Sequence, residues 1–558
     1  MHPRVPVLLA VAFCITACPK AIPPPPPPLT EQQLLTQEVK ELSAQAQALL
    51  ETQNRLVWEY WTEGKPVDIA ATYRGKEALF SIENIRKMDR LRQLAQDPAE
   101  VRALTALKSH FAGEYLAQTL AEYNDAIANL EASLTFTVDG REVRYGELER
   151  LLANEKSAVK RRALYTAAVP AIERLSQSLR RREERTEQLV KELGYPSYEA
   201  FSGELRQADL GRLSLLAEEI LQATQEPYRV VMERLAQREL ALPFTALTRA
   251  DIPRLFRARE VEDAFPKEEP LLRAHASVQG LGIDLAEMPN VYIDAKDTPR
   301  KNSRPLTLAI EVPGDVRLSV KAGSGVLHQA RVMHEFGHAL HYAFTHKLMR
   351  FELARLGNPT VGEAYSALFE DLLEDPVWLE EHAGVRGEQR AQYLAASSAH
   401  KLFLIRRAAG KLLYQLELHR QEGVDAKALY RAIMERTDAM PMKPEDEARY
   451  LVDQEDFFQS ADNFRAWFLA GQLQAQLKAR FGPAWWRSPE AGAFLKGLWS
   501  HGNAWSAKEV AEAMGERGIA PDVLLLRLGT TLQVPIKLDA KTGEGAGLTA
   551  PPQPTREP

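Results

Sequence analysis

Cysteine is almost absent from this chain of 558 residues: Cys14 and Cys18 are the only two, and both lie within the first twenty residues. A disulfide framework therefore cannot hold the body of the protein together. An excess of basic residues is also missing, since 70 Lys and Arg stand against 76 Asp and Glu, a net charge of −6. Proteins that bind nucleic acid usually carry basic stripes and a high pI. The charge balance thus argues against a nucleic-acid partner.

Long apolar runs are a third absence. The longest candidate, residues 7–17, is shorter than the roughly 20 apolar residues that a membrane-spanning helix needs. This run ends in Ile15-Thr-Ala-Cys18, which resembles a bacterial lipobox and predicts removal of a signal peptide, residues 1–17, with lipidation of Cys18. The alternative is an ordinary secretory signal whose cleavage site lies near a cysteine by chance.

Six consecutive prolines, residues 23–28, follow the cysteine. Such a run adopts a stiff polyproline II helix, here about 20 Å long at roughly 3.1 Å per residue. Residues 18–30 are therefore predicted to be a lipid-anchored spacer. Pro19 and Lys20 carry no evident retention signal, which favours the outer membrane of a bacterial envelope. Residues 537–558, rich in Gly, Pro and Thr, are predicted to be a disordered tail.

The body of the chain is predicted to be mostly helical. Apolar residues recur at helical spacing in several stretches, for example at Leu148, Leu152, Val159 and Ala163, and at Leu213, Leu216, Ile220 and Ala223. Two strand-like runs, residues 306–310 and 316–320, flank the turn signal Pro313-Gly314 and predict a small β-hairpin. The hairpin could act as a brace, or its edge could pair with an extended peptide.

The segment 332–344 is predicted to be a buried or half-buried helix, because its apolar residues fall on one stripe. His334 and His338 are four residues apart and share one face, where their neutral imidazoles can bind one zinc ion. Glu335 lies beside them, placed to reach the water on that zinc. With 12 histidines in the chain, this pattern is expected by chance in only about one or two such chains per hundred. The motif therefore favours a zinc site.

A catalytic zinc site takes three protein ligands and leaves a fourth position open. Glu363 lies 29 residues after His334 and is a candidate third ligand. It has a second interpretation, since Thr360-Val-Gly-Glu363 fits a capping box, in which the glutamate closes the start of a helix. The residues alone leave both roles open.

His334-Glu-Phe-Gly-His-Ala-Leu-His341 resembles the active-site helix of the thimet oligopeptidase and oligoendopeptidase F family of zinc metallopeptidases. The angiotensin-converting enzyme family is similar but more distant. Glu363 stands where the first family has its third zinc ligand, and Glu370 matches an acidic position that supports the site. The resemblance extends from about Tyr292 to Gly529 and includes the hairpin segment 311–318.

This resemblance implies a mostly α, two-lobed oligopeptidase fold with a deep channel and a small β-hairpin beside the zinc helix. It also implies one Zn²⁺ per chain, held by His334, His338 and Glu363, with Glu335 as general base. Glu370 would orient a zinc-bound histidine by accepting its second ring proton. A deep channel would admit short extended peptides and exclude folded proteins.

One segment departs from the family pattern. The family stabilises the oxyanion with tyrosines, assisted by a histidine, in the segment that aligns with residues 457–467, where this chain has no Tyr or His. Loss of one such donor typically lowers the rate by about a hundredfold to a thousandfold. The candidates that remain are Gln459, Asn463 and Arg465 within the segment, and Tyr450 and His501 outside it.

Three functions are compatible with these observations. The first is a lipid-anchored zinc oligopeptidase of the bacterial cell envelope, with a helical N-terminal lobe over residues 31–210 and a catalytic region over residues 211–536. It would hydrolyse short peptides and contact the membrane only through its anchor. The second is a catalytically impaired relative that keeps the zinc and binds peptides, and the third is a structural lipoprotein with a silent motif. Glu335 favours the first, because a decayed site does not need its general base.

Overall fold

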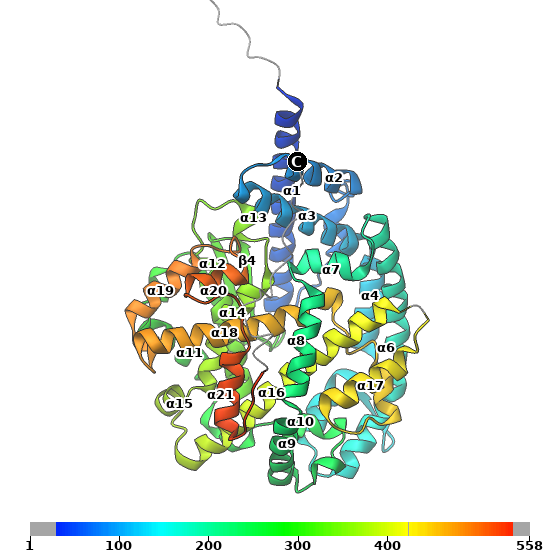
Figure 1. The fold of residues 1–558 in the computed structure, drawn as a ribbon, viewed down its shortest axis with the longest axis vertical. Coiled ribbons are helices and arrows are strands. Elements are labelled where there is room, and N and C mark those ends of the chain that lie inside the picture. Colours follow the sequence, from blue (N-terminus) through cyan, green and yellow to red (C-terminus); the bar gives the residue numbers. More distant parts are fainter. Residues whose placement is uncertain (1–28, 422, 539–558) are drawn as a thin grey trace, which may run out of the picture.

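The computed structural model describes residues 29–421 and 423–538. The expected signal peptide, the lipidation site Cys18, most of the spacer and nearly all of the expected tail lie outside the described residues. The described part is mostly helical and contains two small sheets, which confirms the predicted fold class at this level (Figure 1). None of the described helices combines the length and the apolar character needed to cross a bilayer.

The N-terminal part of the described chain consists of helices and one hairpin. Its elements are α1 (Glu31–Glu63), α2 (Ile82–Leu94), α3 (Pro98–Thr119), α4 (Ala121–Ser133), β1 (Thr135–Val138), β2 (Arg141–Arg144), α5 (Leu148–Asn154), α6 (Ala158–Glu192), α7 (Tyr198–Arg206), α8 (Leu210–Ala223), α9 (Gln225–Leu240), α10 (Ile252–Leu255) and α11 (Pro270–Gly280).

The remaining chain begins with the second sheet and continues with helices. Its elements are β3 (Val291–Asp294), β4 (Leu306–Glu311), β5 (Asp315–Ser319), α12 (Val326–Ala343), α13 (Phe351–Ala354), α14 (Pro359–Glu370), α15 (Pro376–Ala383), α16 (Gly387–Arg420), α17 (Ala426–Asp438), α18 (Ser460–Phe481), α19 (Pro489–Trp499), α20 (Ala507–Ala513) and α21 (Asp522–Leu532).

Local sequence signals explain where several helices begin and end. Thr30 and Gln33 form a capping box at the start of α1, and Gly64 ends that helix in the left-handed conformation, with φ of 67°. The apolar stripe of α8 is buried as its spacing predicts. The stripe predicted from Leu148 to Ala163 lies on two helices instead, because Ser157 caps a new helix, and Val159 is 74% exposed.

The hairpin β1–β2 is a feature that the predictions missed. Asp139 and Gly140 form its turn, with φ of 51° and 71°, and Asp-Gly between two short strands is a strong hairpin signal. The hairpin packs with α5 and α6 around a small core of its own, which includes Phe136, Leu152 and Tyr165.

The predicted hairpin beside the zinc helix is confirmed. Strands β4 and β5 pair antiparallel, and β3, which was not predicted, adds to β5 in parallel. Ala309 and Val316 on this sheet pack against Ala339 of α12, so the sheet braces the helix. The Asn54 side chain of α1 donates to the carbonyl of Ala309, which covers part of the free edge of β4.

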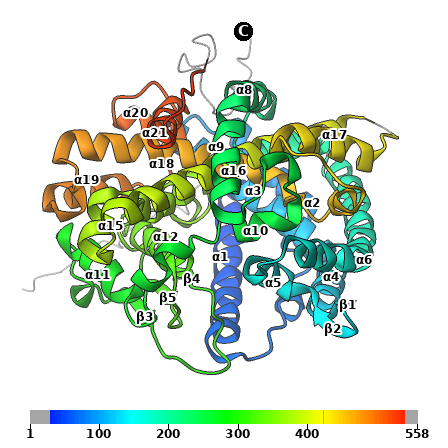
Figure 2. The ribbon, with the colours of Figure 1, turned by 90° about the horizontal axis from the view of Figure 1, so that it is seen from below.

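The main core is continuous across the region that surrounds the candidate metal site. It joins Leu35 of α1 with Val332 and Phe336 of α12, and it includes the buried Trp485 and Trp486. Helix α14 packs against both α12 and α18. Figure 2 shows α12 and the three-stranded sheet on one side of α1, and α4, α5 and the hairpin β1–β2 on the other.

Candidate metal centre

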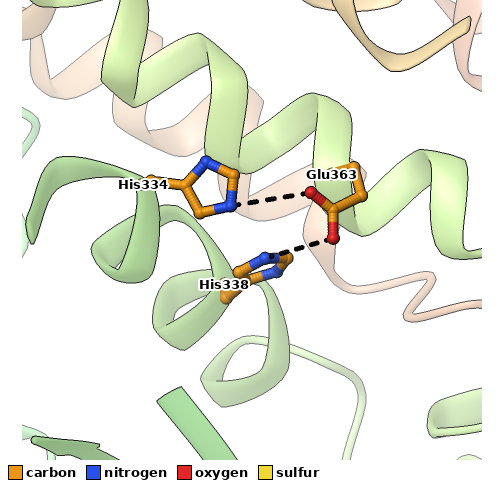
Figure 3. Close-up of side chains that lie close together, drawn as sticks. All are labelled: His334, His338 and Glu363. Carbon is orange, nitrogen blue, oxygen red and sulfur yellow. Dashed lines mark ion pairs between the residues drawn. The ribbon is translucent and has the colours of Figure 1, made fainter. Parts of the chain in front are cut away.

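The three predicted ligands converge from two helices. His334 and His338 project from α12, and Glu363 faces them from α14 (Figure 3). The Nε2 atom of His334 lies 3.5 Å from Oε2 of Glu363, and Nε2 of His338 lies 3.6 Å from Oε1. Tetrahedral ligands at zinc bond lengths are separated by about 3.4 Å. The chemistry and spacing of these donors fit a metal ion, and the three residues form a group that could hold one.

The structure excludes one of the two interpretations of Glu363. Helix α14 is capped by Asn358, whose side chain accepts a hydrogen bond from the Thr360 amide at 2.9 Å. The Thr360 hydroxyl donates instead to Asp462, also at 2.9 Å. The capping-box interpretation is therefore wrong, and the Glu363 carboxylate lies one turn inside the helix, directed at the two histidines.

Gly337, between the two histidines, sets how closely the helices approach. A Cβ atom at this position would lie 2.5 Å from Cα of Ser366 and 2.7 Å from the carbonyl oxygen of Tyr365, both in the backbone of α14. Any side chain would push α14 away from α12. The separation between Glu363 and the histidines consequently depends on this glycine.

Glu370, two helical turns after Glu363 on α14, contacts the first histidine. Its Oε2 lies 3.1 Å from Nδ1 of His334, at hydrogen-bond distance. Burial alone would raise the pKa of Glu370, but the hydrogen bond to His334 and the charge of Lys401 lower it overall. An ionised Glu370 holds the proton on Nδ1 and leaves Nε2 free to bind a metal.

Replacing Glu370 tests this arrangement. We expect Glu370→Gln to lower zinc affinity by about 10- to 100-fold, because the imidazole loses the charge that raises its basicity. Competition with a chelating dye measures the affinity. Glu311→Gln, at the exposed end of β4, is the control and should bind zinc as the unmodified chain does. Equal affinities for the two variants would contradict the role of Glu370.

Glu335 is held against the strand edge. Its Oε2 accepts from the Thr307 amide of β4 at 2.7 Å, and the Thr307 hydroxyl donates to the Glu335 carbonyl at 2.8 Å. Burial raises the pKa of the Glu335 carboxyl above its usual value, although the Thr307 bonds and His334 partly oppose this shift. The carboxylate that lies beside the ligands is therefore both fixed in place and made more basic.

The pKa values of the two histidines shift in opposite directions. Burial holds the pKa of His338 well below its usual value, and the neighbouring His334, His341 and Arg355 lower it further. Burial also acts to lower the pKa of His334, but Glu370, Glu363 and Glu335 raise it overall. The lowered pKa favours the neutral, metal-binding form of His338, whereas the raised pKa of His334 makes metal binding at that residue more dependent on pH.

Three of the five residues considered as oxyanion donors contact other groups in the structure. Arg465 is fully buried and donates to the carbonyls of Arg206 and Gln207. Tyr450 lies in a separate small core and accepts a hydrogen bond from Arg180, and the ring of His501 stacks on Trp505. None of the following lines the cavity beside the ligands: Gln459, Asn463, Arg465, Tyr450 and His501.

That cavity has a volume of about 300 Å³ and is bordered by His338 and Glu363. Tyr342 and Arg355 line it as well, and neither was predicted to belong to the site. Tyr342 follows His338 by four residues, so helical spacing could have placed it on the same face. Its ring lies 6.5 Å from that of His338 between centroids. Arg355 has no such signal, because it comes from the next element of the chain.

Comparison with models of known protein families gave no match, and comparison with curated proteins found no similar sequence. The evidence for a function therefore comes from the motifs of this chain and from the geometry of its candidate site.

Proposed function

We propose that this protein is a zinc metallopeptidase that hydrolyses short, extended peptides. The observation that supports this most directly is the convergence of His334, His338 and Glu363, three donors of the types and spacing that zinc prefers. A half-buried glutamate, Glu335, adjoins them on the same helix. A metal-ligand set with a neighbouring general base is the arrangement that metal-assisted hydrolysis needs.

The residues divide the chemistry between them. When bound, zinc would polarise the scissile carbonyl and make an attacking water more acidic. Glu335 accepts the proton of that water and then donates it to the leaving amine. The Thr307 amide keeps the Glu335 carboxylate in position, and the raised pKa of Glu335 brings it closer to the pH at which proton transfer is efficient.

Substrate class and location follow from the family resemblance and the N-terminal sequence. A two-lobed body with a deep channel, built from residues 31–210 and 211–536, would accept short peptides and exclude folded proteins. Lipidation of Cys18 would attach the protein to the bacterial envelope, on the outer membrane, with the proline-rich segment as spacer. The net charge of −6 gives no basis for a nucleic-acid partner.

Hydrolysis of a quenched fluorogenic peptide library by the full chain in detergent tests the proposal. With zinc at one ion per chain we expect hydrolysis that a chelator stops and added zinc restores. No hydrolysis at that zinc content would exclude the peptidase.

A catalytically impaired, peptide-binding relative is the second candidate. It is favoured by one observation: none of the five residues considered as oxyanion donors lines the cavity. This candidate predicts that the zinc-loaded chain binds peptides from the same library but does not cleave them. Without zinc binding, both candidates would be wrong, and a structural lipoprotein would remain.

A further inference from the structure

A guanidinium without a carboxylate partner borders the cavity beside the metal ligands. Arg355 follows α13, and its Nη1 donates to the Tyr342 hydroxyl at 3.2 Å. Its Nε is buried and has no hydrogen-bond acceptor. Within the described part of the chain no carboxylate pairs with Arg355, whereas Arg206, the other arginine of the cavity, pairs with Asp462 at 2.8 Å. A buried donor without an acceptor costs free energy that a bound anion would recover.

Arg355 lies close enough to the candidate metal site for a short extended peptide to reach both. Its Cζ is 5.2 Å from the centroid of the Tyr342 ring, and that ring is 6.5 Å from the His338 ring. The guanidinium is therefore no more than about 12 Å from His338, the sum of the two distances. An extended peptide advances about 3.3–3.6 Å per residue. A carboxylate up to about three residues beyond a scissile bond at the metal is thus within reach of Arg355.

The charges around the cavity favour an anion at the Arg355 end. Glu363 is the only carboxylate among the described lining residues, and it faces the two histidines. His110 of α3 is half-buried, and desolvation together with the charge of Arg355 lowers its pKa to about 4, so it is neutral at pH 7. The positive charge of Arg355 is consequently not neutralised by any neighbour that lines the cavity.

The size of the cavity limits the length of peptide that it can hold. Ala106, Ser109 and His110 of α3, together with Leu205 of α7, line the same space of about 300 Å³. A volume at the small end of the range for ligand sites holds a few residues and not a long segment. A chain that enters from the metal side would place its end near Arg355.

We propose that this cavity binds the C-terminal carboxylate of a peptide. Arg355 supplies the charge and the forked donors, which match a carboxylate in a bidentate arrangement. Tyr342 is a positioning residue that orients the guanidinium through its hydroxyl and its ring. The inference rests on the proposed function for where the scissile bond lies, and it predicts release of short C-terminal fragments. Binding of the carboxylate itself does not require hydrolysis.

Binding to an inactive variant provides the test. Full-length protein with Glu335→Gln, loaded with zinc in detergent, is titrated into fluorescent pentapeptides that end in a free acid or in an amide, and anisotropy is measured. We expect the acid to bind about 10- to 100-fold more tightly than the amide. Arg355→Gln should abolish this preference, and Arg355→Lys should keep part of it, because lysine retains the charge but not the fork. Arg331→Gln, an exposed arginine on α12, should leave it unchanged.

Several results would overturn the inference. Equal binding of acid and amide excludes a terminal-carboxylate subsite, as does an acid preference that survives Arg355→Gln. An amide peptide that carries an internal glutamate and binds as tightly as the acid would assign the site to a side-chain carboxylate instead. Circular dichroism shows whether the variants fold. If Arg355→Gln does not fold, Arg355→Lys tests the site in its place.

Hydrolysis by the unmodified chain, measured separately, keeps this inference distinct from the proposed function. An Arg355-dependent acid preference without hydrolysis would retain the subsite and exclude the peptidase. Hydrolysis with equal binding of acid and amide would retain the peptidase and exclude the carboxylate subsite.

Discussion

Glu335→Gln is expected to lower peptide hydrolysis by about 10²- to 10⁴-fold, the usual contribution of a general base, while zinc remains at one ion per chain. Glutamine retains an oxygen that accepts from the Thr307 amide, so the side chain keeps its place but cannot take up a proton. The rate of fluorogenic peptide cleavage and the zinc content, measured on the same samples, check both parts of the prediction.

The pH profile gives an independent check of this role. Glu335 acts as a base only when ionised, and burial raises its pKa in the metal-free chain. Activity should therefore be present above that pKa and be lost as the pH falls through it. The residual rate of Glu335→Gln should lack this acidic limb. Glu311→Gln should behave as the unmodified chain, and a Glu335→Gln variant with more than about a tenth of normal activity would exclude general-base catalysis by this residue.

Glu363→Ala is expected to abolish stoichiometric zinc binding and, with it, hydrolysis. Two histidines from one helix remain, which is fewer than the three protein ligands of a catalytic zinc site. Zinc present at 100 times its dissociation constant would stabilise the unmodified fold by about 2.7 kcal/mol. The variant should lose this effect, so its Tm should not rise when zinc is added.

The metal-free variant should be no less stable than the metal-free parent. Burial raises the pKa of Glu363, and the charges of Glu335, Asp462 and Glu370 add to this shift although His334 opposes it, so ionisation of Glu363 costs more free energy in the metal-free fold than in water. Metal analysis and thermal unfolding with and without zinc separate the two effects. Glu311→Ala serves as the control, and retention of one zinc per Glu363→Ala chain would show that the ligand set is wrong.

Local patterns in the sequence were sufficient for part of this description. The helical character of the body follows from apolar spacing, and the β4–β5 hairpin follows from Pro313-Gly314 between two strand-like runs. The shared face of His334 and His338 follows from their separation by four residues. These features depend on residues that are close in the chain. Over such short separations the geometry of the helix or strand backbone fixes which side chains share a face.

The tertiary structure decided the features that depend on contacts between distant segments. Thr360-Val-Gly-Glu363 is compatible with a cap or with a ligand, and only the crossing of α12 and α14 at Gly337 directs Glu363 to the histidines. The cavity with Arg355 also required the fold, because α3 and α7 line it from a part of the chain far from α12 and the end of α13. The sequence by itself determined which helix carries the histidines, since spacing within a helix is fixed by the backbone. Which carboxylate faces them, and which guanidinium borders the cavity beside them, was decided by packing between helices, which no local pattern encodes.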